Sequence, residues 1–233
     1  MSFYLSGGFD WSVFTPQVND MIIRGIWETL YMTLVSTLMG YVLGLPLGIV
    51  LAVTGEKGIA PNRAVYGVLD FIVNITRSVP FLILLILVSP ITKLIVGKSY
   101  GSSATIVPLV IAAAPFIARM VESSIQEVDK GVIEAAQSMG ADNFTIITKV
   151  LIVEAKTSLI VGVTIALGTI LGYSAMAGIV GGGGLGDIAI RYGYYRYDME
   201  IMVVTILILI LLVQIMQYLG MALSKLTDKR KIK

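Results

Sequence analysis

Long apolar runs separated by short polar segments constrain this chain more than any other feature. A membrane-spanning helix needs about 20 mostly apolar residues; four runs meet that criterion, and a fifth, shorter run carries two prolines. The runs cover residues 26–53, 68–96, 104–121, 157–180 and 200–224. Helices of soluble cores are rarely apolar around their whole circumference. The sequence therefore predicts an all-α membrane protein, residues 1–233 forming a single transmembrane domain of five transmembrane helices.

Composition excludes several classes of function. Hydrophobic residues make up 56% of the chain and charged residues only 14%, against about 25% charged in ordinary soluble domains. The chain has no histidine and no cysteine. A disulfide framework, a Cys/His zinc site and a Ser-His or Cys-His nucleophile pair are therefore excluded. We expect no metal site and no cofactor in this chain, and no binding of nucleic acid.

The basic residues predict the orientation in the membrane. With the N-terminus outside, 11 of the 17 Lys and Arg residues fall on cytoplasmic segments and five on external ones, with Arg77 inside the second run. An excess of Lys and Arg on the cytoplasmic side is the rule for membrane proteins. We therefore expect an N-out, C-in topology. Residues 1–23 contain no Lys or Arg, so we expect an aqueous segment there rather than a cleavable signal.

The connection between the third and fourth runs, residues 122–156, is longer than the others and alternates apolar and charged positions at helical spacing. Ile125, Val128, Val132, Ile133 and Ala136 fit one side of interrupted helices in this stretch. Gly140 is a candidate helix terminator, and Asp142 or Asn143 a candidate N-cap of a following helix. We predict a folded cytoplasmic feature with a short coupling helix between spans 3 and 4.

The centre of that connection carries a recognisable motif. Glu134-Ala135-Ala136 with Gly140 resembles the EAA signature of ABC importer permeases, EAA-x3-G-x9-I-x-L-P. In that register Val150 and Ile152 stand for Ile and Leu, and Val153 replaces the usual proline. The resemblance extends from about Gly25 to the C-terminus and is to methionine-import permeases. It rests on Trp27–Leu30, Arg77–Phe81, Ala114–Glu122, Gly172–Gly178, Gly183–Asp187 and Tyr192–Tyr194.

The resemblance implies a homodimeric, multi-pass permease of the bacterial cytoplasmic membrane. It implies two cytoplasmic ATP-binding subunits, which bind ATP and magnesium and hydrolyse the ATP, so that this chain is not itself an enzyme. An extracytoplasmic substrate-binding lipoprotein would deliver L- or D-methionine or a close derivative. Glu134, Ala135, Ala136 and Gly140 would couple ATP hydrolysis to transport by alternating access.

Three further features are candidates for transport or assembly. Tyr173, Ser174 and Met176 bring hydroxyl groups and a flexible thioether into the apolar fourth run, where they are candidates to line a substrate pathway. Arg77 is a charge within the second run, and we predict a structural role for it, with Asp70 two helical turns earlier as the compensating charge. Glycines at positions 40, 44 and 48 form a small-residue stripe, which favours close helix packing within one subunit over a dimer seam.

Other functions remain open from the residues alone. Nothing in composition or spacing specifies methionine, so another amino acid in the same ABC class is an alternative. An ion-coupled secondary transporter is less favoured, because the span count is odd and no carboxylate pair lies within a run. A membrane-embedded enzyme lacks a visible catalytic constellation. The Gly181–Gly186 run has no Gly-Lys-Ser/Thr after it and does not predict nucleotide binding.

Overall fold

The structure is a computed structural model that describes residues 9–227, and every helix named below lies within that range. Residues 228–233, which hold four of the basic residues counted as cytoplasmic, lie outside the described residues. The α-helices are α1 (Pro16–Thr54), α2 (Arg63–Ser78), α3 (Phe81–Leu87), α4 (Ser89–Val96), α5 (Ser102–Gln126), α6 (Lys130–Ser138), α7 (Asn143–Thr145), α8 (Ile152–Glu154), α9 (Lys156–Ala177), α10 (Gly184–Ile188) and α11 (Met199–Thr227). Two 3-10 helices, η1 (Trp11–Val13) and η3 (Gly178–Val180), and two π-helical stretches, η2 (Ile146–Leu151) and η4 (Ala189–Tyr194), complete the described part of the chain.

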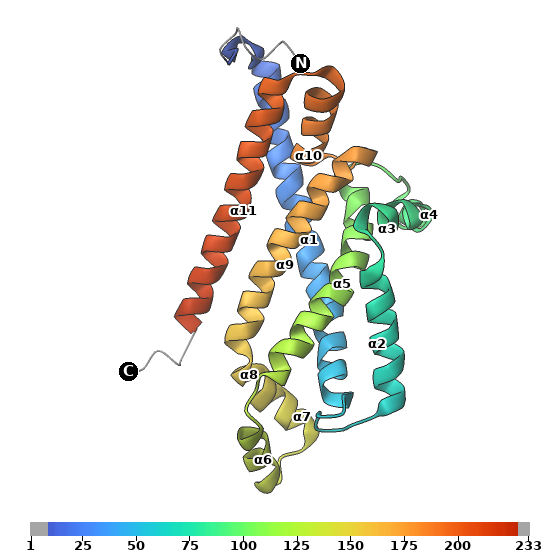
Figure 1. Cartoon of the computed structure of the whole chain (residues 1–233), viewed down its shortest axis with the longest axis vertical. Helices are drawn as coiled ribbons and strands as arrows, with labels where there is room; N and C mark the ends of the chain where they lie inside the picture. The colour runs from blue at the N-terminus through green and yellow to red at the C-terminus, as the bar shows by residue number, and fades with distance from the viewer. Residues whose placement is uncertain (1–8, 228–233) are drawn as a thin grey trace.

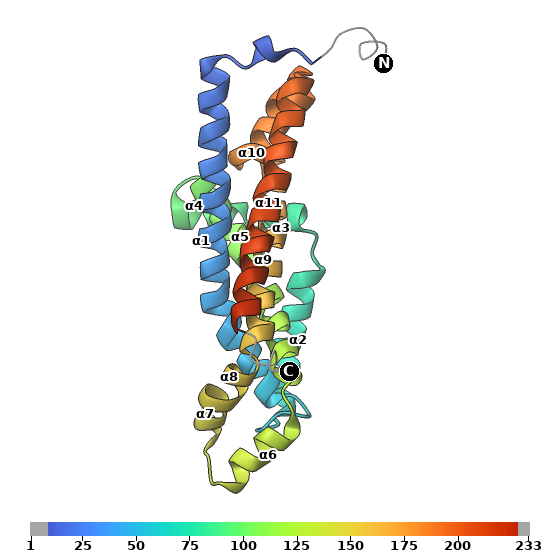
Figure 2. The ribbon, with the colours of Figure 1, turned by 90° about the vertical axis from the view of Figure 1, so that its left-hand side faces the viewer.

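The long helices α1, α5, α9 and α11 run side by side along the long axis of the molecule (Figure 1). Four helical stretches of the described residues are long and apolar enough to cross a membrane, or five if the bent pair α2 and α3 counts as one span. Helices α6 and α7 project beyond the long helices at the end far from the N-terminus, as Figure 2 shows. We call this the α6 end and the other the N-terminal end. The all-helical membrane fold agrees with the sequence prediction.

The second predicted span, residues 68–96, is not one straight helix. Helix α2 ends at Ser78, and α3 begins at Phe81 after a bend of 102°. The bend follows from Pro80, because proline disfavours helical geometry in the residue before it, and Val79 is extended (φ −77°, ψ 123°). Helices α3 and α4 lie across the molecule rather than along it and reach less far towards the N-terminal end than α1 and α11 (Figure 1).

Helix α1 is longer than its apolar run predicts. It begins at Pro16, ten residues before the predicted start, with the Thr15 hydroxyl accepting a hydrogen bond from the Val18 N–H as an N-cap. Proline is well suited to the first helical turn because its missing N–H has no intrahelical partner there. The added turns pack Ile22 against Leu185, Ile188 and Ile201, so the N-terminal end has a small apolar core of its own.

The glycine stripe packs α1 onto α5 within one subunit, as the sequence favoured. A Cβ atom added at Gly40 would lie 2.9 Å from the Cβ of Ala113, and one added at Gly44 would lie 2.6 Å from the Ala114 carbonyl oxygen. Gly48 is equally tight against Ala118. Small residues allow this approach, which in lipid supplies packing that the hydrophobic effect does not.

Candidate functional site

Helix α6 is a short, well-capped helix held to the bundle by one side. The Asp129 carboxylate accepts the Gly131 N–H at 2.7 Å and caps the helix start. Ala136 is buried in a cluster with Ile146, Leu151 and Ala155, which belong to the chain leading into α9. Helix α6 is therefore anchored to the α6 ends of the long helices rather than suspended in a loose loop.

The predicted coupling residues do not share one environment. Glu134 and Ala135 are exposed, whereas Ala136 is buried by this chain's own residues. Of the two alanines, only Ala135 is therefore open to a partner protein. Gly140 is exposed with φ 81°, a left-handed conformation in which it ends the helix as predicted.

Asp142 caps the next helical stretch, again as predicted. Its carboxylate accepts the Thr145 N–H at 3.2 Å, and this hydrogen bonding with Thr145 holds the pKa of the Asp142 carboxyl below its ordinary value. The turn between α6 and α7 is thus fixed by a left-handed glycine on one side and a charged cap on the other.

Apolar side chains are exposed around this turn. Met139 is 82% exposed and Phe144 is 71% exposed, and Val132, which was predicted to share the buried side, is 42% exposed. Ile125 and Val128 of the same predicted side are buried, and Ile133 is partly buried. We call the exposed residues Val132, Glu134, Ala135, Met139 and Phe144 the α6–α7 surface. An exposed apolar patch next to a charge is typical of a protein interaction site.

The predicted pathway residues point in different directions. The Tyr173 ring stacks on the Phe81 ring of α3, with centroids 4.6 Å apart and planes 4° from parallel. Ser174 is 1% exposed, and its hydroxyl donates to the Leu171 carbonyl of its own helix at 2.8 Å, so within this subunit it does not reach an open surface. Met176 is 48% exposed. The structure thus joins Tyr173 to α3 but does not bring the three predicted residues together.

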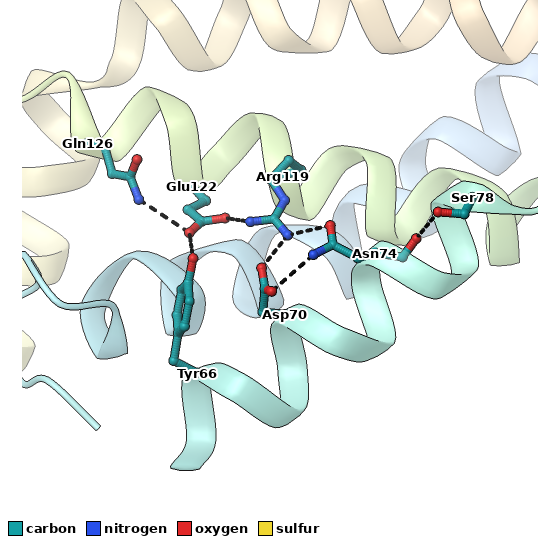
Figure 3. A network of polar contacts seen from close by, with 7 residues as sticks. All are labelled: Tyr66, Asp70, Asn74, Ser78, Arg119, Glu122 and Gln126. Atoms are coloured by element: carbon teal, nitrogen blue, oxygen red, sulfur yellow. Dashed lines mark hydrogen bonds and ion pairs between the residues drawn. The ribbon is translucent and has the colours of Figure 1, made fainter. Parts of the chain in front are cut away.

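The predicted pairing of Arg77 with Asp70 is wrong. Arg77 is exposed in the last turn of α2, and among the described residues Asp70 pairs with Arg119 of α5 at 2.6 Å (Figure 3). Asp70 and Arg77 are seven residues apart on α2. The helical rise separates their Cα atoms by about 10 Å, whereas Arg119 of α5 lies directly beside Asp70.

Arg119 forms the centre of a polar network between α2 and α5 (Figure 3). Its Nη1 donates to Glu122 at 2.7 Å, and its Nη2 donates to Asp70 at 2.6 Å and to Asn74 at 2.8 Å. The other Glu122 oxygen accepts from the Tyr66 hydroxyl and the Gln126 amide, each at 3.2 Å. The other Asp70 oxygen accepts from the Asn74 amide at 3.0 Å.

All four carboxylate oxygens in the network have a donor. This matters most for Glu122, whose side chain is 4% exposed, because a buried charge without partners is costly. This network was not predicted from the sequence. Arg119 lies near the end of the third apolar run and was counted only as a cytoplasmic charge, although Glu122 three residues later is a helix-face partner.

At the N-terminal end, α1 caps the short helix α10. The Glu28 carboxylate accepts the Gly184 N–H at 2.7 Å, and the Thr29 hydroxyl accepts the Leu185 N–H at 2.9 Å. The glycine run before α10 is therefore an ordered turn rather than a flexible connection, with left-handed backbone at Gly181, Gly183 and Gly184. Within residues 9–227 no three Asp or Glu side chains gather closely enough to hold a metal ion.

Comparison with known proteins assigns the family. Residues 44–232 match the family described as binding-protein-dependent transport system inner membrane component. The chain belongs to this family. It is accordingly a permease component of the bacterial inner membrane, with several apolar helices.

Two relatives show which transport proteins the chain resembles. The permease is 51% identical over 212 residues to a probable D-methionine transport system permease protein, MetI, of Vibrio cholerae, covering 91% of this chain and 94% of the relative. It is 50% identical over 204 residues to a methionine import system permease protein, MetP, of Bacillus subtilis, covering 88% and 92%. The sequence resemblance to methionine-import permeases is thus confirmed.

Solved structures agree with the fold. The permease superposes with a TM-score of 0.91 on a chain of the MetNI methionine ABC transporter in inward-facing conformations, at 45% identity, covering 92% of this chain and all of that one. At 20% identity and a TM-score of 0.77, an amino acid ABC transporter crystallised with histidines shares the fold.

Proposed function

We propose that this permease is the membrane subunit of an ATP-driven importer that carries methionine into the cytoplasm by alternating access. The observation that carries the proposal is the match, over about nine-tenths of both chains, to permeases named for methionine transport, together with the fold match to the MetNI transporter. The substrate is assigned through these relatives.

The α6–α7 surface is the site where an ATP-binding subunit docks. Three properties support this assignment: the surface projects beyond the long helices, it exposes Met139 and Phe144, and it carries Glu134 as an anchor for a basic residue of the partner (Figure 2). Helix α6 follows α5 after three residues and packs on the chain leading into α9. A push on α6 therefore reaches both long helices, which is the rigid-body type of switching.

The subunit works as a homodimer with two ATP-binding subunits, which hold the ATP and magnesium and perform the hydrolysis. A binding protein delivers the amino acid at the N-terminal end. This arrangement requires the N-out, C-in topology with five membrane crossings, the second of which is made by the bent pair α2 and α3. Tyr173 and Met176 line the pathway between the two copies, whereas Ser174 braces α9 from inside the subunit.

Transport itself is tested in proteoliposomes that hold the permease with its ATP-binding subunit and are supplied with the binding protein outside. We expect uptake of labelled L-methionine that requires internal ATP and is competed by unlabelled methionine. Uptake that survives ATP depletion and collapses with the proton gradient would identify a secondary transporter. Preferential uptake of a different amino acid would leave the ABC mechanism intact and overturn the substrate.

Coupling is tested at Gly140. A methyl group there meets nothing within 4 Å, so Gly140→Ala acts only through the left-handed backbone, which costs a non-glycine residue about 1–2 kcal/mol. We expect less methionine imported per ATP hydrolysed. The matched control is Gly140→Asn, because asparagine adopts this conformation more readily and should retain more coupling. If Gly140→Ala, Gly140→Asn and Glu134→Ala all import the normal amount of methionine per ATP hydrolysed, the coupling role of α6 is contradicted.

A further inference from the structure

Helix α2 is attached to the bundle in an unusual way for a membrane chain. Val73 is the one residue of α2 that is buried, in a small cluster with Leu51 and Ala118. Leu69 packs against that cluster, but most apolar side chains of α2 point away from the subunit: Val68, Phe71, Ile72 and Ile75 are each at least half exposed. The face towards α5 is polar and carries the Arg119 network. Charged and hydrogen-bonding groups thus supply much of the attachment of α2.

The Arg119 network lies close to α6 along the chain. Arg119, Glu122 and Gln126 occupy the last turns of α5, and α6 begins at Lys130. Through this three-residue connection, a displacement of α6 reaches the part of α5 that holds Asp70 and Tyr66 of α2.

The opposite end of α2 leads to the predicted pathway. After Ser78 the chain bends by 102°, and Phe81, the first residue of α3, stacks on Tyr173 of α9. Phe81 is 7% exposed, so α3 is seated at that point. Helix α2 is consequently an arm between the docking end of α5 and the Phe81–Tyr173 stack.

We propose that Arg119 is a positioning residue for transport: its bonds to Asp70, Asn74 and Glu122 hold α2 on α5, so that movement of α6 reaches the Phe81–Tyr173 stack. The inference rests on the proposed function for its role in transport. The contact between α2 and α5 lies within one subunit, so it can be measured independently of transport. Arg119 touches no substrate in this scheme and acts through α2.

The geometry requires arginine rather than a positive charge in general. Two nitrogens of one guanidinium reach carboxylates on two helices at 2.7 and 2.6 Å, and the Asp70-bound nitrogen also reaches Asn74. A lysine ammonium is a single compact charge that cannot span this fork. Arg119→Lys therefore keeps the charge next to two acids and removes the bridge. It is a milder change than truncation, which would leave Glu122 buried without a cation.

The first experiment measures the attachment directly. The chain has no cysteine, so cysteines introduced at Ile72 on the exposed face of α2 and at Ser123 on α5 are unique labelling sites for nitroxides. In lipid nanodiscs, with the labelled chain diluted in an excess of unlabelled chain so that only distances within one subunit are measured, we expect one narrow distance distribution in the otherwise unchanged protein. In Arg119→Lys the distribution should be broader or split. Identical distributions would overturn the proposal whatever the protein transports.

The second experiment measures the consequence. In the reconstituted transporter we expect Arg119→Lys to keep ATP hydrolysis within about twofold and to lower methionine imported per ATP at least several-fold. A purely structural role would instead lower assembly, hydrolysis and import together. The matched control is Arg77→Gln, an exposed arginine on α2 outside the network, which should preserve import per ATP. Normal coupling in Arg119→Lys, or equal loss in both variants, would refute the assignment. If the unaltered complex imports no methionine, the proposed function fails while the distance measurement still decides the role of Arg119.

Discussion

The close approach of α1 and α5 gives a stability prediction whose size follows from the structure. In Gly44→Ala the new Cβ would lie 2.6 Å from the Ala114 carbonyl oxygen and 2.9 Å from the Ile117 Cβ. Both obstacles are rigid, one being backbone and the other the branching carbon of a side chain. Restoring an ordinary contact of about 3.5 Å means moving the helices apart by almost 1 Å at this point.

A separation of 0.5–1 Å forfeits about a quarter to a half of the attraction of each affected atom pair. Overpacking of this kind costs about 1–3 kcal/mol. The better helix propensity of alanine returns up to about 1 kcal/mol. We therefore expect a net loss of about 1–2 kcal/mol, and a fall in Tm of about 2–8 °C for a chain of this size.

The assay is thermal unfolding of the purified permease in one detergent. Gly67→Ala is the matched control, because Gly67 lies on the exposed side of α2 and a Cβ there meets nothing within 4 Å. Its Tm should stay unchanged or rise. An unchanged Tm in Gly44→Ala, or an equal fall in both variants, would refute the reasoning that this contact is tight and rigid.

Three more substitutions test single contacts. Thr29→Val removes the acceptor of the buried Leu185 N–H and should cost about 1–3 kcal/mol of stability in thermal unfolding, whereas Thr29→Ser keeps the hydroxyl and should cost less. Tyr173→Leu removes the aromatic stack on α3, worth about 0.5–1.5 kcal/mol, and should lower Tm more than Tyr173→Phe, which retains the ring. Asp142→Ala removes the cap on Thr145 and should weaken binding of the ATP-binding subunit, measured by co-purification, while Asp142→Asn preserves an acceptor. Because the pKa of Asp142 is lowered, the cap's stabilisation is present above pH 3.8 and is lost only as the pH falls through the lowered pKa, which circular dichroism against pH can follow.

The length of the apolar runs in the sequence predicted the central helices well. The run at 157–180 corresponds to α9 with its 3-10 extension to Val180, and the run at 104–121 lies inside α5. Hydropathy finds such helices because lipid contact and burial both demand apolar side chains. It cannot find their polar extensions, so α1 was predicted to start at residue 26, whereas Thr15 and Pro16 already carried a start signal.

The second run shows where apolar length misleads. Residues 68–96 were predicted as one span, yet Pro80 sets the geometry and the chain turns by 102°. The local signal, a proline after Val79, was available in the sequence. The direction of the turn could not be predicted, because it depends on the stacking of Phe81 on Tyr173, which lies ninety-two positions later in the chain.

The Arg119–Asp70 pair marks the limit of sequence-based prediction for the site. Spacing on one helix suggested Arg77 as the partner of Asp70, and a single sequence contains no information on which helix lies opposite. The EAA motif was found because its residues are contiguous. Even there, spacing could not tell that Ala135 is exposed while Ala136 is buried, since that depends on the cluster around Ile146.

Helix α5 brings these contacts together, and it does so with two different kinds of surface. Towards α1 it presents Ala113, Ala114 and Ile117 to glycines, a contact that tolerates almost no displacement. Towards α2 it presents Arg119 and Glu122, whose directional bonds hold α2 in place without close packing of the two backbones. The first surface should therefore govern stability and the second coupling. Gly44→Ala should lower Tm more than it lowers import per ATP, and Arg119→Lys should do the reverse. If both variants change both quantities in proportion, α1, α2 and α5 move as one body, and α2 is no separate arm.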